Sequence, residues 1–270
     1  MNGIIEFSGE KYHIFYFEKL TDEIKDKIRA YLSEICNSPW KAKSGRVSYS
    51  YKNTLKNFLV LYNTKDGKKV NKNRQKGLIG ELLVHLLFLE YYPDYIVNSA
   101  YFNMEEHSFK KGFDAILTNK KSKELWITEV KSGENKLGKN ATQTIQSLLS
   151  TSKLDLTKRL KANSEYLWQN AVNHATVYME NAKNSEKKAI LNLLEDYHDK
   201  ATINKITSND INVFLAGVLF HNMNDKFDKS ILPKKVKEYE KKKEFNKIQL
   251  IAIQQKAYLD IKNFLESEAK

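Results

Sequence analysis

The residues best placed to do chemistry are three charged side chains in two short apolar segments. Asp114 lies in Gly112–Leu117, and Glu129 and Lys131 lie near the end of Leu125–Ser132. Successive side chains of a strand point to opposite faces, so Glu129 and Lys131 share one side of a sheet. If the two segments pair as a hairpin, Asp114 lies beside Glu129. Two carboxylates and an ammonium then meet at one point on the sheet.

This combination of side chains is suited to metal-assisted chemistry on a phosphate. Two carboxylates offer the oxygen ligands that Mg²⁺ prefers, together with waters and substrate phosphate. A lysine beside the metal can orient or deprotonate an attacking water and offset charge in a phosphoryl transition state. The spacing therefore predicts a phosphoryl-transfer site at this edge of the sheet.

A structural reading of the same triplet competes with the catalytic one. With 33 acidic and 45 basic residues in the chain, acidic-x-basic triplets arise often by chance. Charged residues also mark the point where a strand leaves the core. The context favours chemistry, because a glycine-x-aspartate strand comes first and the triplet ends a second apolar strand.

The segment Lys72–Tyr92 supplies a helix just upstream of these strands. Its leucines recur at helical spacing, and Pro93 ends it. Gly77 and Gly80 lie inside this helix, where each costs about 1 kcal/mol relative to alanine. We therefore expect both glycines to allow close packing of the helix on the sheet.

Glu81 on this helix has two readings. It is either a surface glutamate at the solvent edge of the helix or a buried acid with a partner. Beside Asp114 and Glu129 it would be a further metal ligand or water contact. His85 is expected to be a packed core residue, and His107, in the loop before the aspartate strand, is a weaker candidate for a phosphate contact.

The remaining pattern alternates strands and helices. Further strands are expected at Ile4–Phe7, His13–Phe17, Tyr95–Phe102, Ile211–Phe220 and Ile248–Ile253. Further helices are expected at Thr21–Ile35, Ala141–Ser150, Thr157–Lys183, Ile190–Asp199, Lys234–Glu244 and Tyr258–Leu265. Tyr49–Tyr62 fits helix or strand, Pro39 is expected to end the first helix, and Asp66–Lys69 reads as a turn.

Composition narrows the class of protein. The chain has 270 residues, 41% hydrophobic and 29% charged, with 3 Pro and 10 Gly, as expected for one compact unit without flexible linkers. Its single cysteine, Cys36, excludes an internal disulfide and a cysteine-based zinc site and fits a reducing cytoplasm. The longest apolar runs are too short to cross a bilayer, so the expected location is cytoplasmic.

The net charge and the absence of certain motifs narrow the class of protein further. The formal net charge of +12 favours a polyanionic partner such as nucleic acid, although lysine-rich chains also arise from AT-rich genomes. The chain has no glycine-rich phosphate loop ending in Gly-Lys-Ser/Thr. We therefore expect no ATP hydrolysis by the chain itself.

The order of these features resembles the PD-(D/E)xK nuclease superfamily over about residues 72 to 222. A helix with Glu81 precedes a strand, a strand with Asp114, a strand with Glu129-Val130-Lys131, and a helix. The resemblance implies an α/β, restriction-endonuclease-like core. In that fold a central mixed β-sheet is flanked by helices, here with N- and C-terminal elaborations. The proline of the superfamily motif is absent, and Gly112-Phe113 precedes the aspartate instead.

Site roles carry over by position from the superfamily. They imply that Asp114 and Glu129 bind Mg²⁺, with Mn²⁺ as a substitute, and that Lys131 assists the water. Glu81 corresponds to a recurrent extra ligand, and Val130 is assigned to the metal set with the acids. The superfamily indicates a reaction class rather than a pathway.

A narrower resemblance is to the HamA family, the nuclease subunit of Hachiman antiphage systems. It rests on chain length, on Gly77-Leu78-Ile79-Gly80-Glu81, on Lys111-Gly112-Phe113-Asp114 and on the appended ends. It implies a Mg²⁺-dependent deoxyribonuclease that acts on DNA and is gated by a HamB-like helicase. The expected organisation is an N-terminal extension (1–70), a nuclease core (71–222) and a C-terminal strand and helix (223–270) that complete the domain.

Two other functions stay open from the sequence. One is a stand-alone restriction or repair endonuclease of the same fold, which would be expected to carry its own target-recognition region. The other is a DNA-binding scaffold subunit with a decayed nuclease core. Because Asp114, Glu129 and Lys131 are all present, the pattern favours an intact site.

Overall fold

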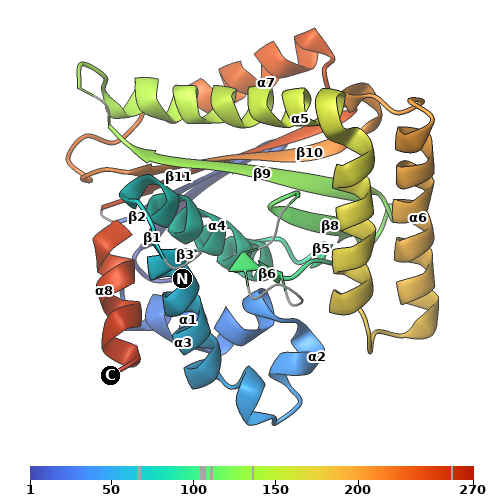
Figure 1. Cartoon of the computed structure of the whole chain (residues 1–270). Helices are drawn as coiled ribbons and strands as arrows, with labels where there is room; N and C mark the ends of the chain where they lie inside the picture. Colours follow the sequence, from blue (N-terminus) through green and yellow to red (C-terminus); the bar gives the residue numbers. More distant parts are fainter. Residues whose placement is uncertain (66–67, 104–107, 110–111, 136, 257) are drawn as a thin grey trace.

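A seven-stranded mixed sheet lies between two layers of helices in the computed structural model (Figure 1). The structure describes residues 1–65, 68–103, 108–109, 112–135, 137–256 and 258–270. The strand order is β1-β2-β11-β10-β9-β8-β5. The strands are β1 (Ile4–Gly9), β2 (Tyr12–Phe17), β5 (Tyr95–Val97), β8 (Ala115–Asn119), β9 (Leu125–Glu134), β10 (Asn212–Phe220) and β11 (Lys247–Gln255).

The centre of the sheet is parallel and its margins are antiparallel. Strands β2, β11, β10 and β9 run parallel, whereas β1 pairs antiparallel with β2, β8 with β9 and β5 with β8. Every residue of β10 is buried, as the continuous apolar run predicts for a strand covered on both faces. The expected α/β class, a central mixed sheet flanked by helices, is confirmed.

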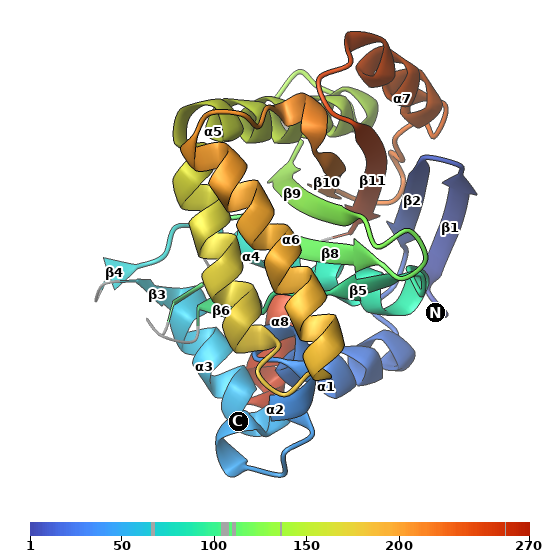
Figure 2. The same ribbon diagram turned by 90° about the vertical axis from the view of Figure 1, so that its right-hand side faces the viewer.

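Each face of the sheet has its own helical layer and its own hydrophobic cluster (Figures 1 and 2). One layer contains α7 (Ile231–Lys242) and α5 (Ala141–Tyr178), which bends so that its C-terminal half and α6 (Asn184–Thr202) run down the right-hand side of Figure 1. The other contains α1 (Asp22–Cys36), α3 (Tyr51–Asn63), α4 (Lys72–Tyr91) and α8 (Tyr258–Glu268), with the short α2 (Pro39–Ala42) after α1. The small strand pairs β3 (Thr64–Lys65) with β4 (Lys68–Lys69) and β6 (Phe102–Asn103) with β7 (Ser108–Phe109) lie outside the main sheet.

Several predicted elements need correction. The two helices expected between Ala141 and Lys183 are one helix, α5, of 38 residues, because no proline or glycine interrupts it. Strand β5 ends at Val97, well short of Phe102. Pro39 begins α2 rather than ending the first helix, since a proline at the first helical position needs no N–H partner.

Other expectations are confirmed. Thr21 caps α1, and its side chain accepts a hydrogen bond from the Ile24 N–H. The ambiguous segment before residue 63 is helical, and α4 ends at Tyr91. Part of the expected turn at Asp66–Lys69 and the candidate His107 lie outside the described residues. No helix in the described part of the chain is both long and apolar enough to cross a bilayer.

Candidate active site

The hairpin of β8 and β9 brings Asp114 next to Glu129, as predicted. Ala115 pairs with Thr128, and the Asp114 N–H donates to the Thr128 carbonyl at 3.1 Å. The next donor on β9, the Val130 N–H, bonds to Asp114 Oδ2 at 2.6 Å. The aspartate side chain thus accepts the hydrogen bond that a backbone carbonyl would accept within the sheet. This happens just before β8 begins, at the end of its pairing with β9.

Two local features hold Asp114 at this point. Gly112 has a φ of +117°, in the left-handed region that favours glycine, so the chain turns sharply into β8. Phe113 is buried and packs edge-on against Trp168 of α5, with ring centroids 5.0 Å apart. The conformation of Gly112 and the packing of Phe113 therefore fix the position of Asp114, which comes directly after them.

Glu129 and Lys131 face the α5 layer, and Val130 faces the opposite layer. Lys131 Nζ lies 2.9 Å from Glu129 Oε1, whereas Val130 belongs to the hydrophobic cluster that includes α4. Glu129 is 2% exposed, while the Lys131 side chain keeps 29% of its surface. The alternation expected from strand geometry is confirmed.

Helix α5 adds three polar residues to this site. Asp155 Oδ2 lies 3.0 Å from Lys131 Nζ, and Arg159 forms an ion pair with Glu129 Oε2 through Nη2. Arg159 Nη1 also donates to the Gly112 carbonyl at 2.9 Å, and the Ser152 hydroxyl donates to the Glu129 carbonyl at 2.8 Å. The site is therefore a cluster of ions shared between β9 and α5.

Sequence reasoning missed these three residues because it placed a helix break between Ser150 and Thr157. In a continuous helix, Ser152, Asp155 and Arg159 follow an i, i+3, i+7 spacing and share one face. A polar stripe on an otherwise uninterrupted helix is the signal that indicates them.

Burial and a neighbouring acid perturb Glu129. Removal from water, and then the charge of Asp114, raise the pKa of Glu129 to about 8, although Arg159 and Lys131 oppose the shift. For Lys131, burial lowers the pKa, but the charge of Glu129 and hydrogen bonds to Glu129 and Asp155 outweigh it, so its pKa is raised. Lys131 is therefore a stable cation in this arrangement rather than a base.

The raised pKa of Glu129 predicts how stability depends on pH. The folded-state value of about 8 exceeds the ordinary 4.5, so the folded protein binds a proton that the unfolded chain releases. This stabilisation is complete below the unfolded pKa and is lost as pH rises toward the folded pKa. With a chelator present, the melting temperature of Glu129→Gln minus that of wild type should increase from about pH 5 to about pH 8 and then level off.

Glu124→Gln is the matched control for this measurement. Glu124 lies at the surface, and its hydrogen bond to Lys247 holds its pKa below the ordinary value. Its difference from wild type should not grow between about pH 5 and about pH 8. A flat difference for Glu129→Gln would contradict the raised pKa.

Glu81 lies on α4, in the helical layer opposite the one that Glu129 and Lys131 face. It lies partly exposed on α4, one turn before His85. His85 is buried, and its Nε2 lies 3.1 Å from the Asp114 carbonyl. Burial raises the pKa of Tyr101, and the charges of Glu81 and Asp114 raise it further. Glu81 and Asp114 thus both lie near Tyr101, and the core role expected for His85 is confirmed.

The chemistry of the donor set fits a divalent cation held by few protein ligands. Asp114 and Glu129 are close enough for their charges to interact unfavourably, and a cation between two carboxylates relieves such repulsion. Among the described residues, no group of three or more His, Cys, Asp or Glu side chains is arranged to hold a metal. Main-chain oxygen, water or substrate phosphate would complete the coordination, as Mg²⁺ commonly requires.

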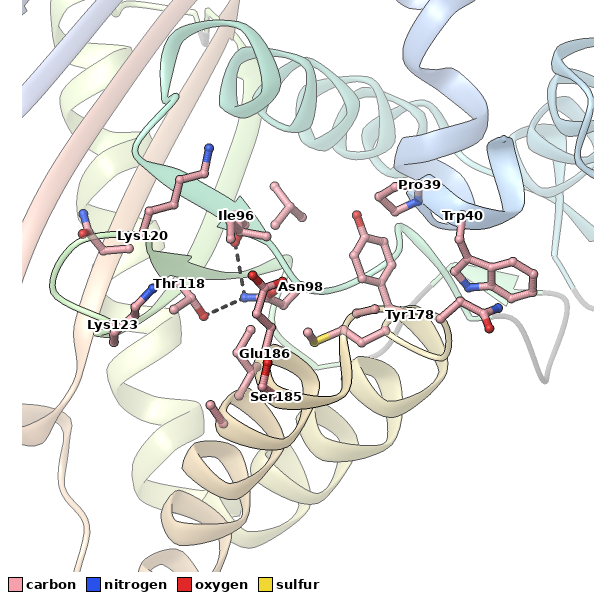
Figure 3. A pocket seen from close by; sticks show the side chains of 17 residues that line it. Pro39, Trp40, Ile96, Asn98, Thr118, Lys120, Lys123, Tyr178, Ser185 and Glu186 are labelled. Atoms are coloured by element: carbon pink, nitrogen blue, oxygen red, sulfur yellow. Dashed lines mark hydrogen bonds between the residues drawn. The ribbon is translucent and has the colours of Figure 1, made fainter. Parts of the chain in front are cut away.

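A cavity of about 440 Å³ lies elsewhere, between β5, α2 and the turn from α5 to α6 (Figure 3). Its lining is mainly apolar, with Lys120 and Lys123 among its polar residues. Asn98 is buried beside it and donates to Thr118 Oγ1 at 2.7 Å and to the Ile96 carbonyl at 3.3 Å. The bond to Thr118 links the residue after β5 to β8. Asp114, Glu129 and Lys131 do not line this cavity.

A family model described as HamA matches residues 5–269, nearly the whole chain. No curated protein and no solved structure matches the chain.

Proposed function

The chain belongs to the HamA family of antiphage defence proteins, and from this premise we propose that it is a metal-dependent DNA nuclease gated by a partner helicase. One observation carries the proposal. The carboxylates of Asp114 and Glu129 and the ammonium of Lys131 lie together where β8 leaves β9. This is the set of groups that metal-assisted cleavage of a phosphodiester needs.

Each residue has a role in this proposal. Asp114 and Glu129 would hold Mg²⁺ or Mn²⁺, with the main-chain oxygen of Val130, and Glu81 on α4 would contact the ion through a water molecule. A bound divalent ion lowers the pKa of its water and offsets charge on the phosphate. Lys131, kept protonated by its two acidic neighbours, stabilises negative charge on the phosphate as the bond breaks.

Two partners are proposed: DNA, because of the positive charge of the chain, and a helicase that keeps the nuclease inactive. The formal net charge of +12 supplies sequence-independent attraction to DNA. A nuclease without sequence preference must be held inactive in its host, and the family's helicase is the natural restraint. We propose that the helicase releases cleavage when it engages DNA.

Co-expression with the helicase of the same system tests this function. The purified complex should degrade plasmid DNA with Mg²⁺ or Mn²⁺, only when the helicase is engaged on DNA, and EDTA should stop cleavage. Failure of the two chains to co-elute at micromolar concentration would contradict the gated complex. Cleavage at one defined sequence by this chain alone would instead indicate a stand-alone endonuclease.

A scaffold with a decayed core is the second candidate, and one observation favours it. Both carboxylate oxygens of Glu129 already bond to protein cations, Lys131 on Oε1 and Arg159 on Oε2. In a decayed site such pairing would be permanent. A complex that binds DNA but shows neither metal binding nor cleavage would support this scaffold function.

A further inference from the structure

We propose that Arg159 is a cationic plug of the candidate active site. Its guanidinium takes the place of a metal at Glu129 when none is bound, and its positive charge opposes metal binding until it moves away. The inference rests on the proposed function and concerns how metal binding at that same site is controlled.

The contacts identify Arg159 as the cation that must move. Glu129 has two carboxylate oxygens, one bonded to Lys131 and the other to Arg159. A divalent cation on either oxygen would be repelled by the positive charge already bonded there, so metal binding favours the departure of one of them. Lys131 has a second charged partner in Asp155 at 3.0 Å, whereas the other bond of Arg159 is to the neutral Gly112 carbonyl. Arg159 is therefore less firmly held in place.

The hydrogen-bond donors of Arg159 are also not all paired. A guanidinium has five N–H donors, and the Nε of Arg159 is buried without a hydrogen bond in the described part of the chain. A permanent counter-ion of a buried carboxylate needs its donors filled to offset the cost of desolvation. The Arg159 side chain keeps 33% of its surface exposed, so it has a route to solvent.

The charge balance of the cluster points the same way. Asp114, Glu129 and Asp155 are acidic, and two cations, Lys131 and Arg159, contact Glu129. Loss of the arginine charge leaves the cluster more negative and one Glu129 oxygen open. Both changes favour a divalent cation. In the wild-type protein, breaking the ion pair between Arg159 and Glu129 reduces the net free energy of metal binding.

Calorimetric titration of the metal-free chain with Mn²⁺ tests the plug. Arg159→Met keeps most of the side-chain length and removes the charge, so it should bind Mn²⁺ about tenfold more tightly than wild type, equivalent to 1.4 kcal/mol. The rise in melting temperature caused by saturating Mn²⁺ should also be larger in the variant. Arg159→Lys, which keeps the charge but lacks the fork that bridges Glu129 and Gly112, should bind with intermediate affinity and keeps the test open if Arg159→Met does not fold.

Lys158→Met is the matched control, because it removes one positive charge from an exposed position of α5 next to Arg159. Its Mn²⁺ affinity should equal that of wild type. Wild-type affinity in Arg159→Met, or a smaller melting shift, would overturn the plug while leaving the metal-dependent function standing. Absence of Mn²⁺ binding in wild type and in both Arg159 variants would overturn the proposed function as well.

Discussion

Lys131→Met is expected to slow DNA cleavage by about 10²–10³-fold without loss of Mn²⁺ binding. Methionine preserves most of the lysine side-chain volume but not its charge. The variant therefore keeps both carboxylates and loses the cation that bonds to Glu129 Oε1 at 2.9 Å. Because a positive charge is removed beside the proposed metal, binding of Mn²⁺ should be equal to wild type or tighter.

Glu129→Gln should behave differently, and the contrast distinguishes the two roles. Glutamine has nearly the shape of glutamate, but it lacks the charge that attracts a divalent cation. Mn²⁺ affinity and cleavage should therefore fall together. Both variants are measured by calorimetry with Mn²⁺ and by plasmid degradation with the helicase present.

Lys27→Met provides the control for Lys131→Met. Lys27 pairs with Glu90 at 2.9 Å and keeps 34% of its side-chain surface, which is close to the exposure of Lys131. It lies on α1, in the helical layer opposite the one that Glu129 and Lys131 face, and its loss should leave cleavage unchanged. Wild-type cleavage by Lys131→Met, or unchanged Mn²⁺ binding by Glu129→Gln, would remove these residues from the mechanism.

Two alanine substitutions on α4 should change stability in opposite directions. A Cβ added at Gly80 would lie 1.8 Å from Ser132 Oγ and 2.9 Å from Ser132 Cβ. Rotation of the serine hydroxyl relieves only the first overlap, because the Cβ is attached directly to the backbone of β9. Gly80→Ala should therefore lower the free energy of unfolding by about 1–3 kcal/mol through overpacking.

Gly77→Ala is the matched substitution in the same helix. Apart from the backbone of α4 itself, no atom of the residues that the structure describes lies within 4 Å of a Cβ at Gly77, so helix propensity is the main change. Stability should rise by about 0.8–1 kcal/mol. Urea denaturation of both variants measures the difference.

The double variant Gly80→Ala with Ser132→Gly checks the cause. Removing the serine side chain opens the space that the new methyl group needs, so part of the lost stability should return. If Gly80→Ala is as stable as Gly77→Ala, α4 and β9 do not approach as closely as the structure places them.

The sequence by itself determined most of the strands and helices and the proximity of the three site residues. The apolar run of β10, the leucine stripe of α4 before Pro93 and the hairpin of β8 and β9 all follow from local patterns. Such patterns record which side chains must be buried and with what period. Asp114, Glu129 and Lys131 lie on neighbouring strands of one hairpin, so strand alternation and register are enough to bring them together.

The tertiary structure alone decided which other groups enter the site. Arg159 and Asp155 reach Glu129 and Lys131 because α5 crosses over β9. The orientation of α5 and its distance from the sheet depend on packing across the whole helical layer. The same dependence separates Gly80, which packs against Ser132, from Gly77, where an added Cβ would meet open space among the described residues. It also places Glu81 in the layer opposite α5. A one-dimensional pattern gives the face of each element, but contacts between distant segments depend on how all the side chains of both layers fill space together.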